Sequence, residues 1–246
     1  MARKKDSSHT AETLRELEAS GDRIADWASE NAALILGVIA GILVIAAGVG
    51  MWSQHSTNER EKAVNALAEV SGNYRKAMGA DPLAAEIPEP ANADLAERTR
   101  REYVEQFESV GSKYAGTTVA SVALLEAAKL HVELGNEAAG ITNYEAARDA
   151  SPESAIGAMA SVRLAGLAES RGDMKTAAEA FERAAGVDAY PLRAVALGDA
   201  ARCWAQANET DRALAAYQRF EAEYPDTQLA PYIEAMLAEL KAQQEV

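Results

Sequence analysis

Three stretches of eleven residues share one pattern: LGNEAAGITNY (134–144), RGDMKTAAEAF (171–181) and ANETDRALAAY (207–217). Each has Gly or Asn at its second position, a small residue at its seventh and an aromatic residue at its eleventh. The aromatic residues are 37 and 36 residues apart, and Phe107 extends the series by another 37. Gly or Asn just past a helix end is typical of a left-handed cap. Each stretch therefore predicts a helix, a tight turn and a second helix.

The repeat period explains why these helices are expected to stack. One helical hairpin cannot cover its own apolar face, so neighbouring hairpins must pack on one another. Small residues let the two helices of a hairpin approach, and the aromatic ring fills the gap to the next hairpin. We therefore predict that the four rings are core residues and not part of a cofactor site. They are Phe107, Tyr144, Phe181 and Tyr217.

This pattern resembles the tetratricopeptide repeat over about residues 98–244. Small residues match its eighth and twentieth positions, the aromatic residues match its twenty-fourth, and Pro152 and Pro225 match its thirty-second. The sequence departs from the pattern in its longer period and at His131 and Ala168, where Tyr is usual. The resemblance implies an all-α solenoid with a C-terminal capping helix, and the apolar run from Leu229 to Leu240 fits that helix.

Composition excludes several classes of function. The chain has 38 Asp and Glu against 24 Lys and Arg, a net charge of −14, which argues against nucleic acid because phosphate binding needs a basic face. With Cys203 as the single cysteine, neither an internal disulfide nor a cysteine-rich zinc site can form. The sequence has no Gly-rich phosphate loop, no HExxH and no GxSxG, and its three His are scattered. We expect no catalytic residue, metal, cofactor or small-molecule substrate.

Residues 32–52 contain no charged side chain. As a helix, 21 residues span roughly 31 Å, which matches the hydrocarbon core of a bilayer, so we predict a transmembrane helix. A buried helix of a soluble protein and a cleaved signal peptide are the alternatives. More basic residues precede this stretch than follow it, which predicts a cytoplasmic N-terminus and a C-terminal domain on the opposite side of the membrane.

Small residues in this stretch recur at helical spacing and could pack against a partner helix in the membrane. They are Ala33, Gly37, Gly41 and Gly48. The leader before it contains a possible amphipathic helix with Leu14, Leu17, Ile24 and Trp27 on one side. This helix could lie at an interface, and a solvated leader remains the alternative.

The predicted organisation has five parts. They are a cytoplasmic leader (1–31), a transmembrane helix (32–52), a polar helix continuing from it (53–79), a loop rich in Pro (80–92) and the tetratricopeptide-like domain (93–246).

The first helices of the hairpins are expected to form a concave, largely apolar face that binds an amphipathic helix or an extended apolar segment of another protein. An alternative is that several of these residues contact the neighbouring helix and that no ligand uses the face. The predicted residues are Val122, Leu125, Lys129, Val132, Met159, Val162, Glu169, Val195, Arg202 and Gln206.

The order of these parts is similar to that of the bacterial ancillary subunit of the Sec translocon, as are the stretches KYAGT (113–117), LLEA (124–127) and LGNEA (134–138). The resemblance implies an adaptor anchored in the bacterial inner membrane, with its C-terminal domain in the periplasm, that contacts translocon subunits, periplasmic chaperones or secreted chains. It implies no catalytic residue. Two alternatives remain open: a scaffold for another cell-envelope assembly or division complex, and an enzyme or secreted soluble protein.

Overall fold

The computed structural model describes residues 58–81 and 86–244. The chain divides into two compact units, Met1–Arg60 and Glu61–Val246, and nearly all described residues belong to the second. In the described part of this unit the regular structure is entirely α-helical, beginning with residues 61–77 of a helix that is described over residues 58–77. The helices that follow are α3 (Ala93–Lys113), α4 (Thr118–Glu133), α5 (Glu137–Ala150), α6 (Ala155–Ser170), α7 (Met174–Ala185), α8 (Arg193–Gln206), α9 (Thr210–Glu223) and α10 (Pro231–Gln244).

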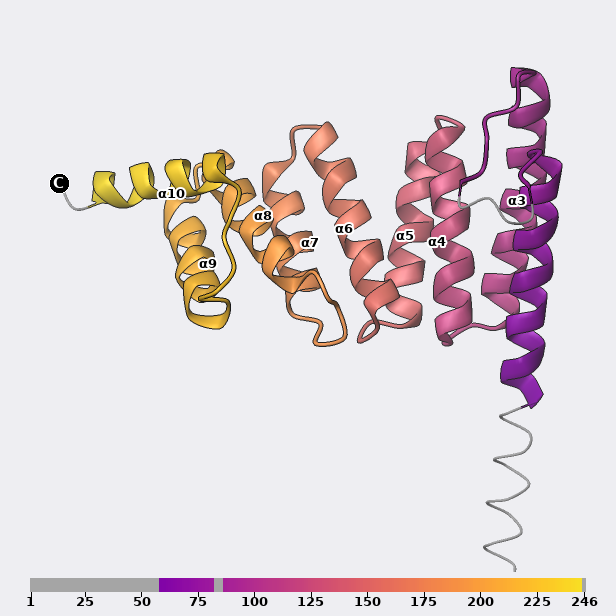
Figure 1. Ribbon diagram of the computed structural model, residues 1–246, viewed down its shortest axis with the longest axis horizontal. Coiled ribbons are helices and arrows are strands. Elements are labelled where there is room, and N and C mark those ends of the chain that lie inside the picture. Colours follow the sequence, from indigo (N-terminus) through magenta and orange to yellow (C-terminus); the bar gives the residue numbers. More distant parts are fainter. Residues whose placement is uncertain (1–57, 82–85, 245–246) are drawn as a thin grey trace, which may run out of the picture. The chain divides into compact units, whose positions relative to one another are not determined.

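The helices of the second unit pack in the order of the sequence, as Figure 1 shows. From α3 to α9 each helix packs against the next, and α4 also contacts α6. The last helix, α10, contacts both α8 and α9 and lies across them in Figure 1. This arrangement of stacked hairpins with a terminal helix is the predicted all-α repeat solenoid.

Local sequence signals set the ends of these helices. Thr117, Ser154 and Asp173 each accept a hydrogen bond from a backbone N–H three residues ahead, which satisfies one of the free donors at the start of a helix. The predicted left-handed ends are confirmed, with φ of 75° at Gly135, 76° at Gly172 and 61° at Asn208. Because Asn tolerates this conformation better than most residues with a side chain, the third turn keeps the same geometry without Gly.

Buried apolar residues form two clusters along the solenoid. The N-terminal core joins the helix over residues 61–77 with α3 and α4, and in it the Tyr74 ring lies 5.4 Å from Tyr103 and 6.2 Å from Phe107, centroid to centroid. The C-terminal core extends from α6 to α10 and contains the fully buried Trp204. Tyr144 and Ala147 of α5 are buried between α4 and α6 but belong to neither cluster. The two cores are therefore separated at α5.

Arg100 attaches the loop before α3 to the solenoid. Its guanidinium forms ion pairs with Glu89 of the loop and with Glu133 at the end of α4, where the Nε–Oε2 distance is 2.8 Å. The Arg100 side chain is 15% exposed, so these pairs are partly shielded from water. Of the loop predicted at 80–92, residues 82–85 lie outside the described part.

One part of the predicted architecture is corrected. In residues 58–81 and 86–244 no helix is long and apolar enough to cross a membrane, and the longest helix named above, α3, carries charged residues along its length. The predicted fold is therefore corrected to an all-α repeat solenoid, with no membrane-spanning helix among these residues. The stretch 32–52, its small residues Ala33, Gly37, Gly41 and Gly48, and the leader 1–31 lie outside the described residues.

Candidate protein-binding face

The ten residues predicted for the concave face lie on the first helices of three hairpins. Val122, Leu125, Lys129 and Val132 are on α4; Met159, Val162 and Glu169 are on α6; Val195, Arg202 and Gln206 are on α8. Four of them have exposed side chains, and the other six are partly buried. The exposed ones are Lys129, Met159, Val195 and Gln206.

Val132 shows why some of these residues are partly buried. A Cβ placed on Gly140 of α5 would lie 2.7 Å from Cγ2 of Val132, so Val132 packs directly onto the backbone of the second helix. Its methyl group belongs to the contact within the hairpin and is not free for a ligand. Val132 therefore contacts the neighbouring helix α5.

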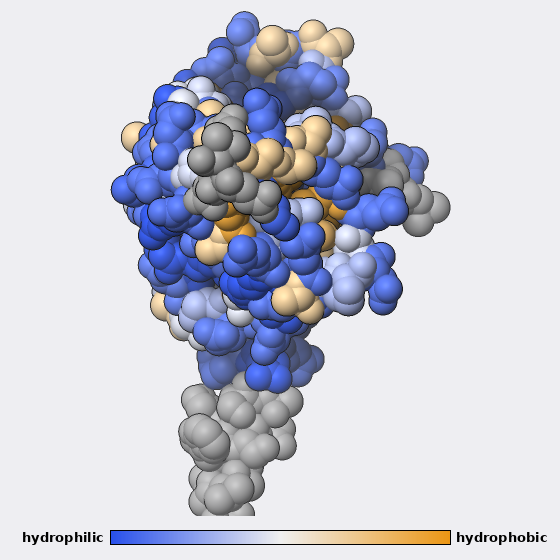
Figure 2. Space-filling view, turned by 90° about the vertical axis from the view of Figure 1, so that its left-hand side faces the viewer, coloured by the Kyte–Doolittle hydropathy of each residue, from blue (hydrophilic) through white to orange (hydrophobic). Residues whose placement is uncertain are grey.

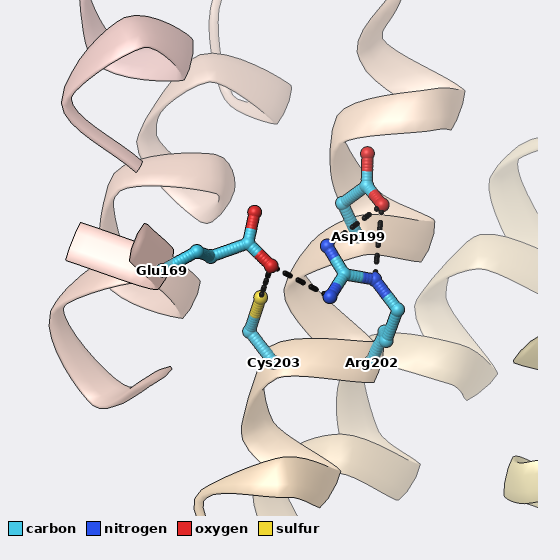
Figure 3. Close-up of polar contacts among 4 residues, drawn as sticks. All are labelled: Glu169, Asp199, Arg202 and Cys203. Atoms are coloured by element: carbon cyan, nitrogen blue, oxygen red, sulfur yellow. Dashed lines mark hydrogen bonds and ion pairs between the residues drawn. The ribbon is translucent and has the colours of Figure 1, made fainter. Parts of the chain in front are cut away.

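Glu169 of α6 and Arg202 of α8 are brought together where the hairpin of α8 and α9 packs on the hairpin of α6 and α7 (Figure 3). Their Oε1 and Nη1 atoms are 2.6 Å apart, and the Arg202 and Glu169 side chains are only 12% and 24% exposed. Arg202 also donates from Nε and Nη2 to Oδ1 of Asp199, at 3.2 Å each. Because two carboxylates share one guanidinium, this cluster carries a net negative charge.

Burial shifts the pKa of two members of the cluster, Asp199 and its neighbour Cys203. Burial raises the pKa of the Asp199 carboxyl, and Arg202 counteracts that effect. Burial also raises the pKa of the Cys203 thiol to about 12, so the thiol is neutral near pH 7. Cys203 is fully buried, as expected from the sequence, and its sulfur lies 3.5 Å from Oε1 of Glu169. A neutral, inaccessible thiol of this kind is not a nucleophile.

A groove of about 280 Å³ lies where α8, α9 and α10 meet. Its walls are mostly apolar, and Asp199 is the one charged residue among those that line it. Two apolar side chains at its edge are exposed to solvent: Val195 on α8, at 55%, and Tyr232 on α10, at 63%. Figure 2 faces the end of the unit that carries α10, where small apolar areas interrupt a mostly hydrophilic surface.

Sequence reasoning missed Asp199 and Tyr232. Asp199 could have been found, because Val195, Asp199 and Arg202 follow one another at the i, i+4, i+7 spacing of a single helix face. Tyr232 had no such signal, because its place beside α8 depends on the direction in which α10 crosses the last hairpin.

The four predicted core rings occupy equivalent positions on α3, α5, α7 and α9. Phe107, Tyr144 and Phe181 are buried, at 1%, 5% and 5% exposure. Tyr217 is partly buried and packs against the C-terminal core. The last ring is more exposed because α10 crosses the final hairpin instead of a further hairpin with the same geometry.

Among residues 58–81 and 86–244, no group of three or more His, Cys, Asp or Glu side chains is arranged to hold a metal ion. The chemistry that the described surface offers is that of contact with another macromolecule: exposed apolar side chains beside partly shielded charges.

Antiparallel helical hairpins that stack in sequence order, with their first helices α4, α6 and α8 on one face, define a helical-repeat solenoid. The family model for the tetratricopeptide repeat-like domain matches residues 25–242, so this chain belongs to that family. No curated protein matches the sequence.

Two solved structures are similar to this fold. One is a kinesin light chain of Podosopora anserina with nearly identical TPR-like repeats, at 16% identity and a TM-score of 0.44, over 62% of this chain and 85% of that one. The other is a single-residue variant of the same protein, with the same identity and TM-score, over 62% of this chain and 84% of that one.

Proposed function

We propose that this chain is an adaptor that binds a segment of another protein on the face formed by α4, α6 and α8. Solenoids of stacked hairpins generally present such surfaces to protein partners. The observation that carries the proposal is the exposure of Met159 on α6 and Val195 on α8, two first helices that the partly buried Glu169–Arg202 pair joins. Apolar side chains beside oriented charges supply both contact area and register for a bound segment.

Site-specific photocrosslinking tests this proposal. A photoreactive phenylalanine analogue in place of Met159 or Val195 should give adducts to a discrete set of proteins in cells. The control is the same analogue in place of Leu95, which is 50% exposed on α3 and so matches Val195 in accessibility. Identical adducts from all three positions, or none from Met159 and Val195, would contradict the proposal.

We further propose a place for this adaptor: the periplasmic side of the bacterial inner membrane, with translocon subunits, periplasmic chaperones or secreted chains as partners. Two features support this more specific version: the similarity of stretches in residues 113–138 to the bacterial ancillary subunit of the Sec translocon, and the same order of parts along the chain. The uncharged stretch 32–52, on which the location depends, lies outside the described residues.

Depletion of the translocon separates the translocon-associated adaptor from its alternative, a scaffold for another envelope or division complex. If the specific version is correct, the adducts from Met159 and Val195 should include translocon subunits or chaperones, and those adducts should diminish when the translocon is depleted. Adducts that persist unchanged would favour a scaffold for another envelope or division complex. Accessibility of the repeat domain to protease in intact spheroplasts would test the location independently.

A further inference from the structure

The groove where α8, α9 and α10 meet, called here the groove between α8 and α10, depends on one close contact between α8 and the segment before α10. A Cβ on Gly198 would lie 2.3 Å from Cδ2 of Leu229, so the missing side chain lets Leu229 sit directly on the backbone of α8. Leu229 is buried and belongs to the C-terminal core. This contact fixes the segment before α10, and it leaves a hollow on the N-terminal side of α8 between Val195 and Tyr232.

Exposed apolar side chains concentrate beside this hollow. Six large apolar residues are exposed in the described part of the chain, and three of them are Leu192, Val195 and Tyr232. Val195 and Tyr232 line the same groove, and Leu192 is the N-cap residue of α8, three residues before Val195. Single exposed apolar residues are ordinary, but an adjacent set beside a groove is typical of an interaction site.

Charge determines which partner fits. No basic residue is among those that line the groove, and its one charged residue, Asp199, uses Oδ1 for both bonds to Arg202. The second carboxylate oxygen points away from Arg202 in Figure 3. A cation that reached this oxygen would counteract the burial that disfavours the charged carboxylate. A second copy of this chain, with its own net charge of −14, is a poor occupant on electrostatic grounds.

We propose that the groove between α8 and α10 binds a partner segment in which an apolar side chain is flanked by Lys or Arg. The apolar side chain enters between Val195 and Tyr232, and the cation pairs with Asp199. This inference rests on the proposed function, because it names the chemistry of the segment that the adaptor would bind at the C-terminal end of its face.

Synthetic peptides of defined composition test this directly. The probe is a fluorescein-labelled peptide of four Ser-Leu-Lys repeats, measured by fluorescence anisotropy with the full chain. Two matched peptides replace Lys by Glu or Leu by Ser. The Leu–Lys peptide should bind at least tenfold more tightly than either, and its affinity should fall as salt is raised. Equal affinities for the three, or no binding of the Leu–Lys peptide, would overturn the inference.

Variants then place the binding site. Tyr232→Ser and Asp199→Asn should each weaken binding of the Leu–Lys peptide about fivefold or more, and Asp199→Asn should reduce the preference for Lys over Glu. The control Leu95→Ser, on α3, removes a side chain of similar exposure and should leave the affinity unchanged. Thermal unfolding followed by circular dichroism shows whether each variant is folded.

The two proposals can fail separately. Peptide binding that is lost in Met159→Ser but kept in Tyr232→Ser would place the segment elsewhere on the face, which overturns the groove and leaves the adaptor function. Absence of both peptide binding and specific crosslinks from Met159 and Val195 would contradict both.

Discussion

Two equivalent contacts between hairpins differ in one polar interaction. Where α7 meets α8, Trp204 is fully buried and its Nε1 donates to Oε1 of Glu182 at 2.9 Å. Where α5 meets α6, the equivalent positions one repeat earlier hold Ala168 and Glu145, and Ala168 has no side-chain donor. We call these the α7–α8 joint and the α5–α6 joint.

The α3–α4 joint resembles the α7–α8 joint. There His131 and Glu108 occupy the same repeat positions, with Nε2 of His131 3.0 Å from Oε1 of Glu108. Asn143 of α5 donates to the same oxygen at 2.7 Å. A polar contact therefore recurs at the outer joints, whereas the α5–α6 joint, between the two apolar cores, buries the Tyr144 ring and small residues such as Ala147 and Gly157. The comparison indicates that repeat geometry can be kept by two different kinds of contact.

The largest effect is expected from Trp204→Ala. Removing this buried ring takes away packing against the C-terminal core and the stacking of Arg212, whose guanidinium carbon lies 3.9 Å from the ring centroid. We expect a loss of about 3–5 kcal/mol in the free energy of unfolding, measured by urea denaturation. Tyr232→Ala, which removes an exposed ring from α10, is the control and should change stability by no more than about 0.5 kcal/mol. Similar losses in the two variants would contradict the assignment of the core.

Gly157→Ala tests how closely the α5–α6 joint is packed. The added Cβ would lie 2.4 Å from the carbonyl oxygen of Ser151, a backbone atom that cannot move without shifting the turn. We expect a loss of about 1–3 kcal/mol and a broader or two-step urea transition, because the two cores would be less strongly coupled.

The matched control lies on the same helix. Gly166 is exposed on α6 and has nothing within 4 Å of an added Cβ, so Gly166→Ala should stabilise the chain by about 0.5–1 kcal/mol through helix propensity alone. If both glycine substitutions were stabilising, the joint would be looser than the structure indicates.

A smaller difference is expected between Glu182→Ala and Glu145→Ala. The first leaves the buried indole N–H of Trp204 without its acceptor and should cost about 1–2 kcal/mol. The second removes an exposed carboxylate at the equivalent repeat position and should stay within about 0.5 kcal/mol. Equal costs, measured by thermal or urea unfolding, would mean that the polar contact contributes nothing specific to the α7–α8 joint.

The rate at which a thiol reagent labels Cys203 reports small changes in local opening, because Cys203 is the single cysteine and lies in the C-terminal core. Burial raises the pKa of its thiol to about 12, so labelling by a thiol reagent at pH 8 should require local opening. Glu182→Ala should speed labelling about five- to tenfold, whereas Glu145→Ala should leave the rate unchanged. Rapid labelling of the unmodified protein would contradict the buried position of this thiol.

Much of the fold follows from short stretches of sequence. The turns at Gly135, Gly172 and Asn208 were predictable because a left-handed helix end depends on one residue and its immediate neighbours. The face of α4, α6 and α8 was predictable only in part. The repeat register placed ten residues on it, but the register could not show that Val132 packs on Gly140 or that Glu169 pairs with Arg202.

The sequence by itself determined the period of the repeat, the positions of its turns and the small residues that let paired helices approach, because each depends on contacts within one hairpin. Tertiary structure decided which side chains meet across hairpins: Trp204 with Glu182, Arg202 with Glu169, and Tyr232 with the groove beside Val195. These contacts depend on the angle between successive hairpins and on the direction of α10. That geometry arises from the packing of many side chains together, so no single motif encodes it.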